Sequence, residues 1–318
     1  MTSIIFMGTP DFAVPILQGL VQASYQVLAV VTQPDRPVGR RRRLTASPVK
    51  KAALDLNIPV YQPEKLPKSA DLTKLINLKP DLIITAAYGQ FLPKKLLKAV
   101  KIKALNVHAS LLPKYRGGAP IQRALMAGEK QTGVTILEMV AKMDAGGLFS
   151  QKIVSIAPDD DTGSLFAKLS LAGRDLLLKT LPKIIAGTMI EVPQADEDVT
   201  FAPNIKATEA QLNLQAPASE LVNKVRALRP DPIAYLYLNE KRTRVLASHV
   251  ADLSTSLSPG AVVKADKKNL WLAAGSGSVW ALDQLQVAGK KPMAIAAFMN
   301  GYGQDFIAGQ NMVVFHED

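Results

Sequence analysis

The most informative segment of the chain reads Ile102-Lys103-Ala104-Leu105-Asn106-Val107-His108-Ala109-Ser110-Leu111-Leu112-Pro113. Its apolar beginning predicts a buried strand, and Ser-Leu-Leu-Pro predicts the turn that ends that strand. Because side chains alternate along a strand, Asn106 and His108 are expected to point to the same side. Ligands of open α/β sheets bind beyond the carboxyl ends of the strands. An amide and an imidazole at that edge can polarise a carbonyl group and handle a proton, as acyl transfer without a covalent nucleophile requires.

Strand-like and helix-like segments alternate around this segment, which predicts a mostly parallel sheet. Strands are expected at 3–7, 26–32, 81–86, 102–109 and 133–139. Helices are expected to begin near Asp11 and to cover 48–56 and 165–186. From 188 to about 208 the apolar periodicity fades and acidic residues cluster, so residues 190–208 are interpreted as a linker that follows a first domain at 1–189.

Residues 209–318 predict a second, smaller domain that consists mainly of short strands. A helix is expected at 218–228, and strands are expected at 234–238, 244–248, 261–264, 270–273 and 278–282. Many short strands with turns between them are typical of a small barrel or sandwich. The fold class expected is therefore α/β, with a Rossmann-like N-terminal domain and a C-terminal β-barrel that is OB-like.

Composition excludes several classes of protein. The 318 residues are 48% hydrophobic and 20% charged, which is ordinary for a chain with a substantial core. No apolar run approaches the roughly 20 residues of a membrane helix, and the N-terminus lacks a signal peptide, so a cytoplasmic protein is expected. The absence of cysteine excludes disulfides, thiolate zinc sites and cysteine nucleophiles. With only three histidines, far apart in sequence, no metal is expected. We expect a monomer.

The net charge of +11 is concentrated in residues 1–208, which hold 27 Lys and Arg against 17 Asp and Glu. Residues 209–318 hold 11 against 10. A basic block lies between the predicted strand 26–32 and the predicted helix 48–56. Only Asp35 opposes its arginines, which are Arg36, Arg40, Arg41, Arg42 and Arg43. Such a block is usually a solvated loop. Near an active site it also suits a polyanionic substrate.

Several motifs, in this order, resemble those of the folate-dependent formyltransferases. The active-site motifs are Asn106-x-His108, Ser110-Leu111-Leu112-Pro113, Tyr115-Arg116-Gly117, Ala119-Pro120-Ile121 and Asp144-Ala145-Gly146. Three other segments resemble the members of this family that act on methionyl-tRNA, namely Gly8-Thr9-Pro10-Asp11-Phe12, the segment 32–40 and the segment 87–93. The resemblance extends over nearly the whole chain, to the segment 288–293.

The resemblance implies transfer of the formyl group of 10-formyltetrahydrofolate to the amino group of methionyl-initiator tRNA, for translation initiation. Asn106 and His108 would stabilise the tetrahedral intermediate, and Asp144 would assist proton transfer. The cofactor would be bound by Ser110, Leu111, Leu112 and Pro113 and flanked by Tyr88, Gly89 and Gln90. The tRNA would be bound by Arg36, Arg40, Arg41, Arg42 and Arg43, with help from the C-terminal domain. That domain departs from the family pattern at Asp231, where an aromatic residue is usual, and at 212–214.

Other functions remain open at this point. A nicotinamide enzyme is disfavoured, because the Gly8 segment lacks the second and third glycines of the dinucleotide fingerprint. An amino-sugar-nucleotide formyltransferase would share the core site, and the arginine block argues against it. A formyltetrahydrofolate hydrolase has no need of that block. An inactive RNA-binding relative has no need to retain Asn106, His108 and Asp144.

Overall fold

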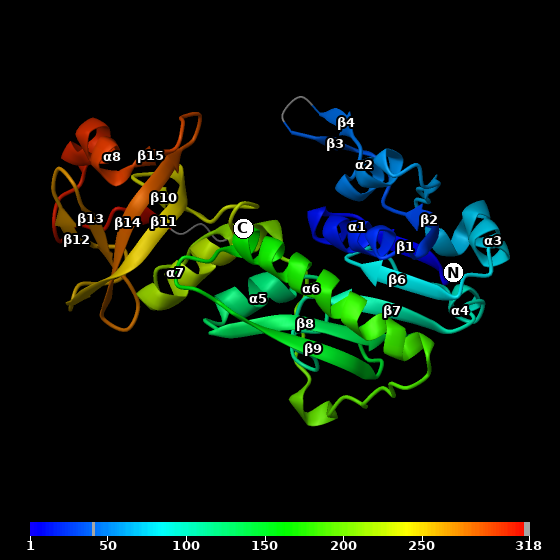
Figure 1. Ribbon diagram of the computed structural model, residues 1–318. Helices are drawn as coiled ribbons and strands as arrows, with labels where there is room; N and C mark the ends of the chain where they lie inside the picture. The colour runs from blue at the N-terminus through cyan, green and yellow to red at the C-terminus, as the bar shows by residue number, and fades with distance from the viewer. Residues whose placement is uncertain (40–41, 315–318) are drawn as a thin grey trace. The chain divides into compact units, whose positions relative to one another are not determined.

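The computed structural model describes residues 1–39 and 42–314 and divides into two compact units (Figure 1). The first unit comprises 1–120, 130–156 and 165–204, and the second comprises 121–129, 157–164 and the chain from Ile205 onward. Arg40 and Arg41, both predicted to bind tRNA, lie outside the described residues.

The first unit is organised by a seven-stranded sheet in the order β5-β2-β1-β6-β7-β8-β9. Its strands are β1 (Ser3–Gly8), β2 (Gln26–Val31), β5 (Val60–Tyr61), β6 (Leu82–Ala86), β7 (Lys103–His108), β8 (Gln131–Glu138) and β9 (Leu148–Ser155). All pairs from β5 to β7 are parallel, while β8 and β9 are antiparallel to their neighbours. The mostly parallel sheet is therefore confirmed. The sequence did not predict β9, whose side chains are largely exposed.

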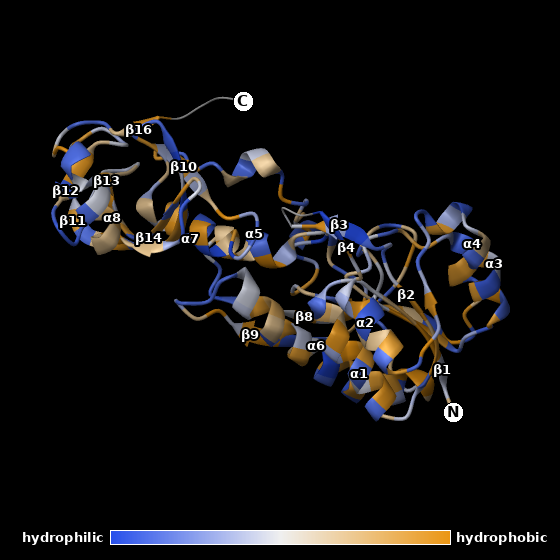
Figure 2. Cartoon of the chain, turned by 90° about the horizontal axis from the view of Figure 1, so that it is seen from above, coloured by the Kyte–Doolittle hydropathy of each residue, from blue (hydrophilic) through white to orange (hydrophobic). Residues whose placement is uncertain are grey.

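Helices lie on both faces of this sheet (Figure 1). They are α1 (Val14–Gln22), α2 (Pro48–Asp55), α3 (Ala70–Asn77), α4 (Lys94–Leu97) and α6 (Thr162–Ile185), with short 3-10 turns at Asp11–Ala13, Leu66–Lys68 and Asp196–Asp198. The helix α5 (Pro120–Met126) belongs to the second unit from Ile121 onward. On one face, Leu75 of α3 and Leu96 of α4 pack on strand residues that include Ile5 and Ile83. Hydrophobic residues run along β1 and β2, whereas α1 and α6 are mixed (Figure 2), as expected for helices that cover a sheet.

The basic block lies in a hairpin that is followed by the capped helix α2. Ser47 is the N-cap of α2, and its hydroxyl accepts from the backbone N–H of Lys50 at 3.0 Å, as the Ser-Pro pair predicts. Between β2 and α2, a small antiparallel hairpin forms from β3 (Arg36–Val38) and β4 (Arg43–Thr45). The hairpin was not predicted from the sequence.

The second unit contains an antiparallel sheet in the order β12-β13-β14-β11-β10-β16, with β15 paired to β14. Its elements are a 3-10 turn at Ala207–Ala210, α7 (Ala218–Ala227), β10 (Tyr235–Leu238), β11 (Lys241–Ser254), β12 (Val262–Ala265), β13 (Leu270–Ala273), β14 (Ser278–Val287), β15 (Met293–Ala294), α8 (Ile295–Tyr302), a 3-10 turn at Gly303–Asp305 and β16 (Val313–Val314). The backbone of Gly309 and Gln310 bonds to Val262, which joins the two ends of the sheet. The sheet curls as a half-barrel around the buried Trp280, which agrees with the mainly antiparallel second domain expected from the sequence.

Residues 190–204, predicted to belong to a linker, are part of the first unit. Val192 and Leu148 exchange two backbone hydrogen bonds of 2.8 Å at the edge of β9. Further on, Phe201 forms a bridge with Arg116. These contacts are made by the backbone, while the side chains of Val192 and Phe201 are exposed. The segment therefore lacks the apolar periodicity by which an ordered element is predicted from sequence.

The carboxylate of Asp81 ties the beginning of β1 to the beginning of β6. It accepts from the backbone N–H and the hydroxyl of Ser3, both at 2.8 Å, and pairs with Lys101 at 3.1 Å. The hydrogen bonds from the Ser3 backbone and hydroxyl, with the bond from Lys101, hold the pKa of Asp81 at about 2, below its usual 3.8.

We therefore expect the stabilisation contributed by Asp81 to depend on pH. Because its pKa in the folded chain lies below the unfolded value, this stabilisation is complete above about pH 4 and is lost as the pH falls toward 2. The difference in thermal midpoint between the unmodified chain and Asp81→Asn should shrink over that interval. Exposed Asp252 provides the control, since Asp252→Asn should leave the midpoint unchanged across the interval. A difference for Asp81→Asn that does not vary with pH would contradict this account.

Candidate active site

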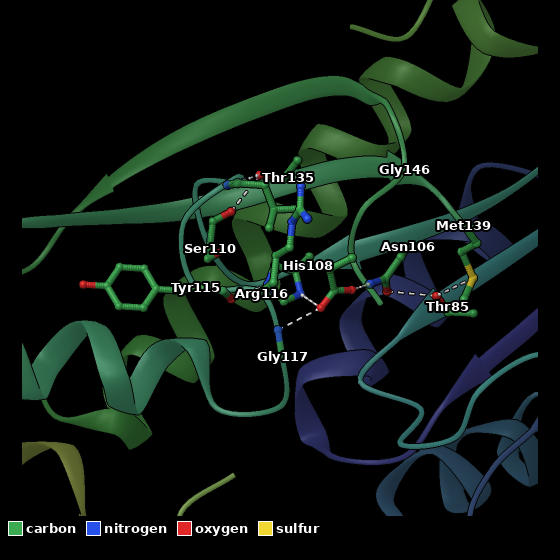
Figure 3. Close-up of polar contacts among 12 residues, drawn as sticks. Thr85, Asn106, His108, Ser110, Tyr115, Arg116, Gly117, Thr135, Met139 and Gly146 are labelled. Atoms are coloured by element: carbon green, nitrogen blue, oxygen red, sulfur yellow. Dashed lines mark hydrogen bonds and ion pairs between the residues drawn. The ribbon is translucent and has the colours of Figure 1, made fainter. Parts of the chain in front are cut away.

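Asn106 and His108 lie in β7 (Figure 3), and both contact the carboxylate of Asp144. The Asn106 Nδ2 donates to Asp144 Oδ1 at 3.2 Å, and His108 Nδ1 lies 3.6 Å from Asp144 Oδ2. The backbone N–H of Gly117 donates to the same Oδ2 at 2.9 Å. Asn106 and His108 thus point to the same side, as strand periodicity predicts. The structure brings the three predicted catalytic residues together.

The amide of Asn106 is oriented by Thr85 on the neighbouring strand β6. The Thr85 hydroxyl lies 2.8 Å from Asn106 Oδ1, to which it donates. The amide oxygen is therefore occupied, and one Nδ2 hydrogen points to Asp144. Among the described residues no group accepts the second Nδ2 hydrogen, which can donate to a ligand.

The imidazole of His108 is oriented by a backbone carbonyl group. His108 Nε2 lies 3.0 Å from the carbonyl oxygen of Tyr115. Because a carbonyl oxygen only accepts, Nε2 must carry the hydrogen. In the neutral ring, the lone pair is then on Nδ1, the nitrogen that faces Asp144. A proton captured from a ligand can be held between Nδ1 and the carboxylate.

The site is largely shielded from water and has an unusual backbone. The side chains of His108 and Asp144 are only 7% and 12% exposed. Tyr115 and Asp144 have φ angles of 62° and 48°, in the left-handed region, which costs a residue other than glycine about 1–2 kcal/mol. Strained backbone of this kind persists only where its surroundings fix it, and it is concentrated at functional sites.

Gly117 allows two chain segments to meet at the site. Its φ of 127° disfavours any residue with a side chain, and an added Cβ would lie 2.6 Å from the carbonyl oxygen of Ala202. Across this contact, the Arg116 N–H donates to the Thr200 carbonyl and the Ala202 N–H to the Arg116 carbonyl, at 2.9 and 2.7 Å. Glycine at 117 is therefore required for the N–H that reaches Asp144.

Sequence reasoning missed Gln194, which bonds to both loops of the site. Its Nε2 donates to the carbonyl oxygens of Asp144 and Gly146, both at 2.8 Å. Its Oε1 accepts from the Arg116 Nε and Nη2 at 3.0 and 2.7 Å. Only the following acidic cluster marks this segment in the sequence, and it gives no sign of these contacts.

Gln194 and Arg116 also border a pocket of about 390 Å³ whose lining includes Lys142, Glu191 and Asp196.

The predicted cofactor segment 110–113 is fixed by hydrogen bonds. Ser110 is fully buried, and its hydroxyl donates to the Lys114 carbonyl at 2.7 Å. Gln151 Nε2 donates to the Leu112 carbonyl at 2.7 Å, and Leu112 is also buried. Leu111 and Pro113 are partly exposed. Of the four predicted side chains, only these two are therefore available to a ligand.

The second predicted cofactor segment follows β6, at the same edge of the sheet. Tyr88 points inward, where burial raises the pKa of its phenol, and its hydroxyl has no hydrogen-bond partner among the described residues. Gln90 is held by the Leu66 N–H and the Pro63 carbonyl. Gly89 is exposed, and so is Phe91, at 62%. This segment therefore offers backbone at Gly89 and the aromatic face of Phe91, instead of the Tyr88 side chain.

The arginines of the basic block differ in their contacts. Arg36 forms a bidentate pair with Glu64, with distances of 3.1 and 2.6 Å, and both side chains are exposed. Arg42 and Arg43 are exposed at the turn and on β4. Asp35, which precedes the hairpin, is held by Gln62 and by Lys50 at 2.7 Å, and these hydrogen bonds lower its pKa.

Among residues 1–39 and 42–314, no group of three or more His, Asp or Glu side chains is placed to hold a metal ion. No described helix is both long and apolar enough to cross a membrane.

Family comparisons match both halves of the chain. Residues 1–181 match the formyl transferase family, and residues 204–303 match the formyl transferase C-terminal domain. The methionyl-tRNA formyltransferase of Lacticaseibacillus casei is 55% identical over 98% of this chain and 98% of its own length. That of Enterococcus faecalis is 52% identical over 96% and 97%.

Solved structures share the fold at lower identity. An N-formyltransferase from Helicobacter canadensis, in complex with folinic acid and dTDP-3-aminofucose, has a TM-score of 0.69 at 19% identity and covers 89% of this chain and 99% of its own. HypX from Aquifex aeolicus, in complex with tetrahydrofolic acid, has a TM-score of 0.63 at 16% identity over 99% of this chain and 51% of its own. On the family matches and the full-length identity, the chain belongs to the formyl transferase family and, within it, to the methionyl-tRNA formyltransferase group.

Proposed function

We propose that this enzyme transfers the formyl group of 10-formyltetrahydrofolate to the free amino group of methionyl-initiator tRNA. The observation that carries the proposal is the convergence of Asn106, His108 and the Gly117 N–H on the Asp144 carboxylate. The full-length similarity to methionyl-tRNA formyltransferases supports the choice of substrate. The product, N-formylmethionyl-tRNA, serves translation initiation, and such a role fits a cytoplasmic enzyme.

In the proposed reaction, the methionine amine attacks the formyl carbon and the bond from that carbon to the N10 nitrogen of the folate breaks. Negative charge develops on the formyl oxygen, and the free Nδ2 hydrogen of Asn106 is the donor for it. One preorganised donor of this kind contributes about 3 kcal/mol. Thr85 keeps the amide from rotating, so the donor needs no reorganisation during the reaction.

His108 and Asp144 handle the proton in this scheme. The amine loses a proton as it forms its new bond, and Nδ1 of neutral His108 accepts it. The resulting imidazolium is stabilised by Asp144 Oδ2, 3.6 Å from Nδ1. The same proton is returned to N10 of the leaving folate, so no net proton is gained or lost by the enzyme.

The folate fits the edge of the sheet between β1 and β6. Strand order reverses there, since β2 lies on one side of β1 and β6 lies on the other. Such a switch point forms the ligand crevice of open α/β sheets. Thr9 after β1 donates to the Tyr88 carbonyl after β6, which fixes the two loops relative to each other. Gly89 and Phe91 supply exposed backbone and an apolar ring, and Leu111 and Pro113 supply further apolar surface.

The tRNA fits the basic hairpin, because the hairpin follows the carboxyl end of β2. The strands β2, β1, β6 and β7 are parallel neighbours, so β2 and His108 reach the same sheet edge. Three strand spacings separate them by roughly 14 Å. Exposed arginines on a hairpin that follows this sheet edge suit phosphates close to the aminoacyl end of the tRNA. We expect a monomer with no metal requirement.

The direct test is formyl transfer from 10-formyltetrahydrofolate to methionyl-initiator tRNA. Methionyl-elongator tRNA and an amino-sugar nucleotide are run in parallel, together with an assay for release of free formate. Transfer confined to the initiator tRNA is expected. Transfer to the sugar alone, formate release alone, or no turnover would each overturn the proposed function.

We expect His108→Ala to lower kcat by about 10²- to 10⁴-fold, because the proton acceptor is lost. KM for the tRNA should stay within about twofold, since His108 makes no contribution to phosphate binding in this scheme. His249→Ala is the matched control, because His249 lies in β11 and pairs with Asp283 at 2.9 Å. Steady-state kinetics of both variants decide the matter, and near-normal turnover of His108→Ala would remove this residue from the mechanism.

We expect Arg43→Ala to raise KM for methionyl-tRNA severalfold and leave KM for the folate unchanged. The loss of one phosphate contact should also reduce the salt dependence of tRNA binding by about one unit of slope. Arg174→Ala, which removes the same charge from α6, is the control. The assignment of the hairpin fails if folate binding is lost instead, or if both variants behave alike. The same measurement on Arg40→Ala tests whether Arg40, in the same basic block, also binds the tRNA.

A further inference from the structure

Gln194 uses every hydrogen-bonding group of its side-chain amide within the site. The two Nε2 hydrogens are directed to the carbonyl oxygens of Asp144 and Gly146, and Oε1 receives two N–H groups from Arg116. Arg116 is only 3% exposed, so its side chain is held within the protein. An amide with all its groups engaged has one orientation, which makes it a rigid connection.

This connection links the two loops that carry the polar groups of the site. One loop supplies the Asp144 carboxylate, and the other, around Arg116, supplies the Tyr115 carbonyl that orients His108 and the Gly117 N–H that binds Asp144 (Figure 3). Gln194 bonds to the backbone of the first loop and to the side chain of the second. The distance between the two loops is therefore set in part by a residue that lies in neither loop.

Gln194 is itself held on both sides. Before it, Val192 and Leu148 exchange two backbone hydrogen bonds of 2.8 Å. After it, Thr200 and Ala202 bond to the backbone of Arg116 at 2.9 and 2.7 Å. The segment 192–202 thus forms a brace, with one end attached to the first residue of β9, the other attached to Arg116, and Gln194 between those ends.

We propose that Gln194 is a positioning residue for formyl transfer, which fixes the Asp144 carboxylate against His108 and Asn106. The inference rests on the proposed function. Asp144 has a left-handed backbone with φ of 48°, and the bonds from Gln194 to the carbonyls of Asp144 and Gly146 oppose its relaxation. Without them, the loop relaxes and Oδ2 moves away from His108 Nδ1. A misplacement of about 1 Å costs on the order of 100-fold in rate.

Two substitutions test this role. Gln194→Met keeps the length of the side chain and removes every hydrogen bond. Gln194→Glu keeps an acceptor for Arg116 and replaces the donor by an oxygen that faces two carbonyl oxygens, so it provides the test if the methionine variant fails to fold. Each should lower kcat by about 10- to 100-fold, with both KM values within about twofold of the unmodified enzyme.

A double-mutant cycle with Asp144→Asn separates positioning from general destabilisation. If Gln194 acts through the carboxylate, Gln194→Met should change kcat by less than about threefold once Asp144 is already replaced. Losses that multiply in the double variant would overturn the proposal, as would single variants with normal kcat. Thermal midpoints are measured for every variant.

Ser170→Ala is the matched control for lost stability. Ser170 is buried in α6, and its hydroxyl donates to the Phe12 carbonyl at 2.7 Å, so its removal also breaks a bond to a backbone carbonyl. It should lower the thermal midpoint and leave kcat unchanged. Failure of the proposed function has a different signature, because the unmodified enzyme would then transfer no formyl group to methionyl-initiator tRNA. If Asp144→Asn lowers kcat and the Gln194 variants remain fully active, only the positioning role of Gln194 is overturned.

Discussion

A carboxylate that is largely shielded from water needs hydrogen-bond donors, and the Asp144 carboxylate finds them in two separate parts of the chain. Oδ1 accepts from Asn106 of β7, while Oδ2 accepts from the Gly117 N–H and faces His108. The last residues of β7, the turn after it and the loop after β8 are therefore required to meet at one point. Much of the local backbone follows from this requirement, including the left-handed angles at Tyr115 and Asp144 and the glycine at 117. The same contacts leave a free amide hydrogen and an imidazole lone pair facing the site.

The parallel sheet places several loops of the site at one edge. Because β2, β1, β6 and β7 run in the same direction, the loops that follow them emerge at one edge. The groups proposed for the chemistry lie on β7. The loops proposed to bind the folate follow β1 and β6, and the basic hairpin proposed to bind the tRNA follows β2. A single sheet edge thus orders three different tasks by strand position, in the way that open α/β sheets generally build their sites. Of the arginines proposed to bind the tRNA phosphates, those at 42 and 43 are exposed, whereas Arg36 is already paired with Glu64.

The brace 192–202 adds a second level of support. It pairs through its backbone with Leu148 at one end and with Arg116 at the other, and Gln194 bonds to both loops between these ends. Lys103 strengthens this arrangement, because its ammonium lies 2.9 Å from Glu138 and 3.4 Å from Glu191, the residue just before the brace. Support of this kind is what a strained backbone requires in order to persist. It also explains why residues far along the sequence from Asn106 and His108 belong to the same compact unit.

The sequence by itself determined the parallel α/β order of the first domain, the barrel-like second domain, and the family. Those features are encoded locally, by apolar periodicity, by the Ser47-Pro48 cap and by motifs such as Asn106-x-His108, so neighbouring residues suffice to predict them. Strand alternation even predicted that Asn106 and His108 share a side. Only the tertiary structure decided that Ser110, Leu112 and Tyr88 turn inward, that β9 forms an edge strand, and that the predicted linker braces the site. These outcomes depend on hydrogen bonds between segments distant in sequence and on backbone groups that every residue has. No local pattern of side chains therefore predicts them.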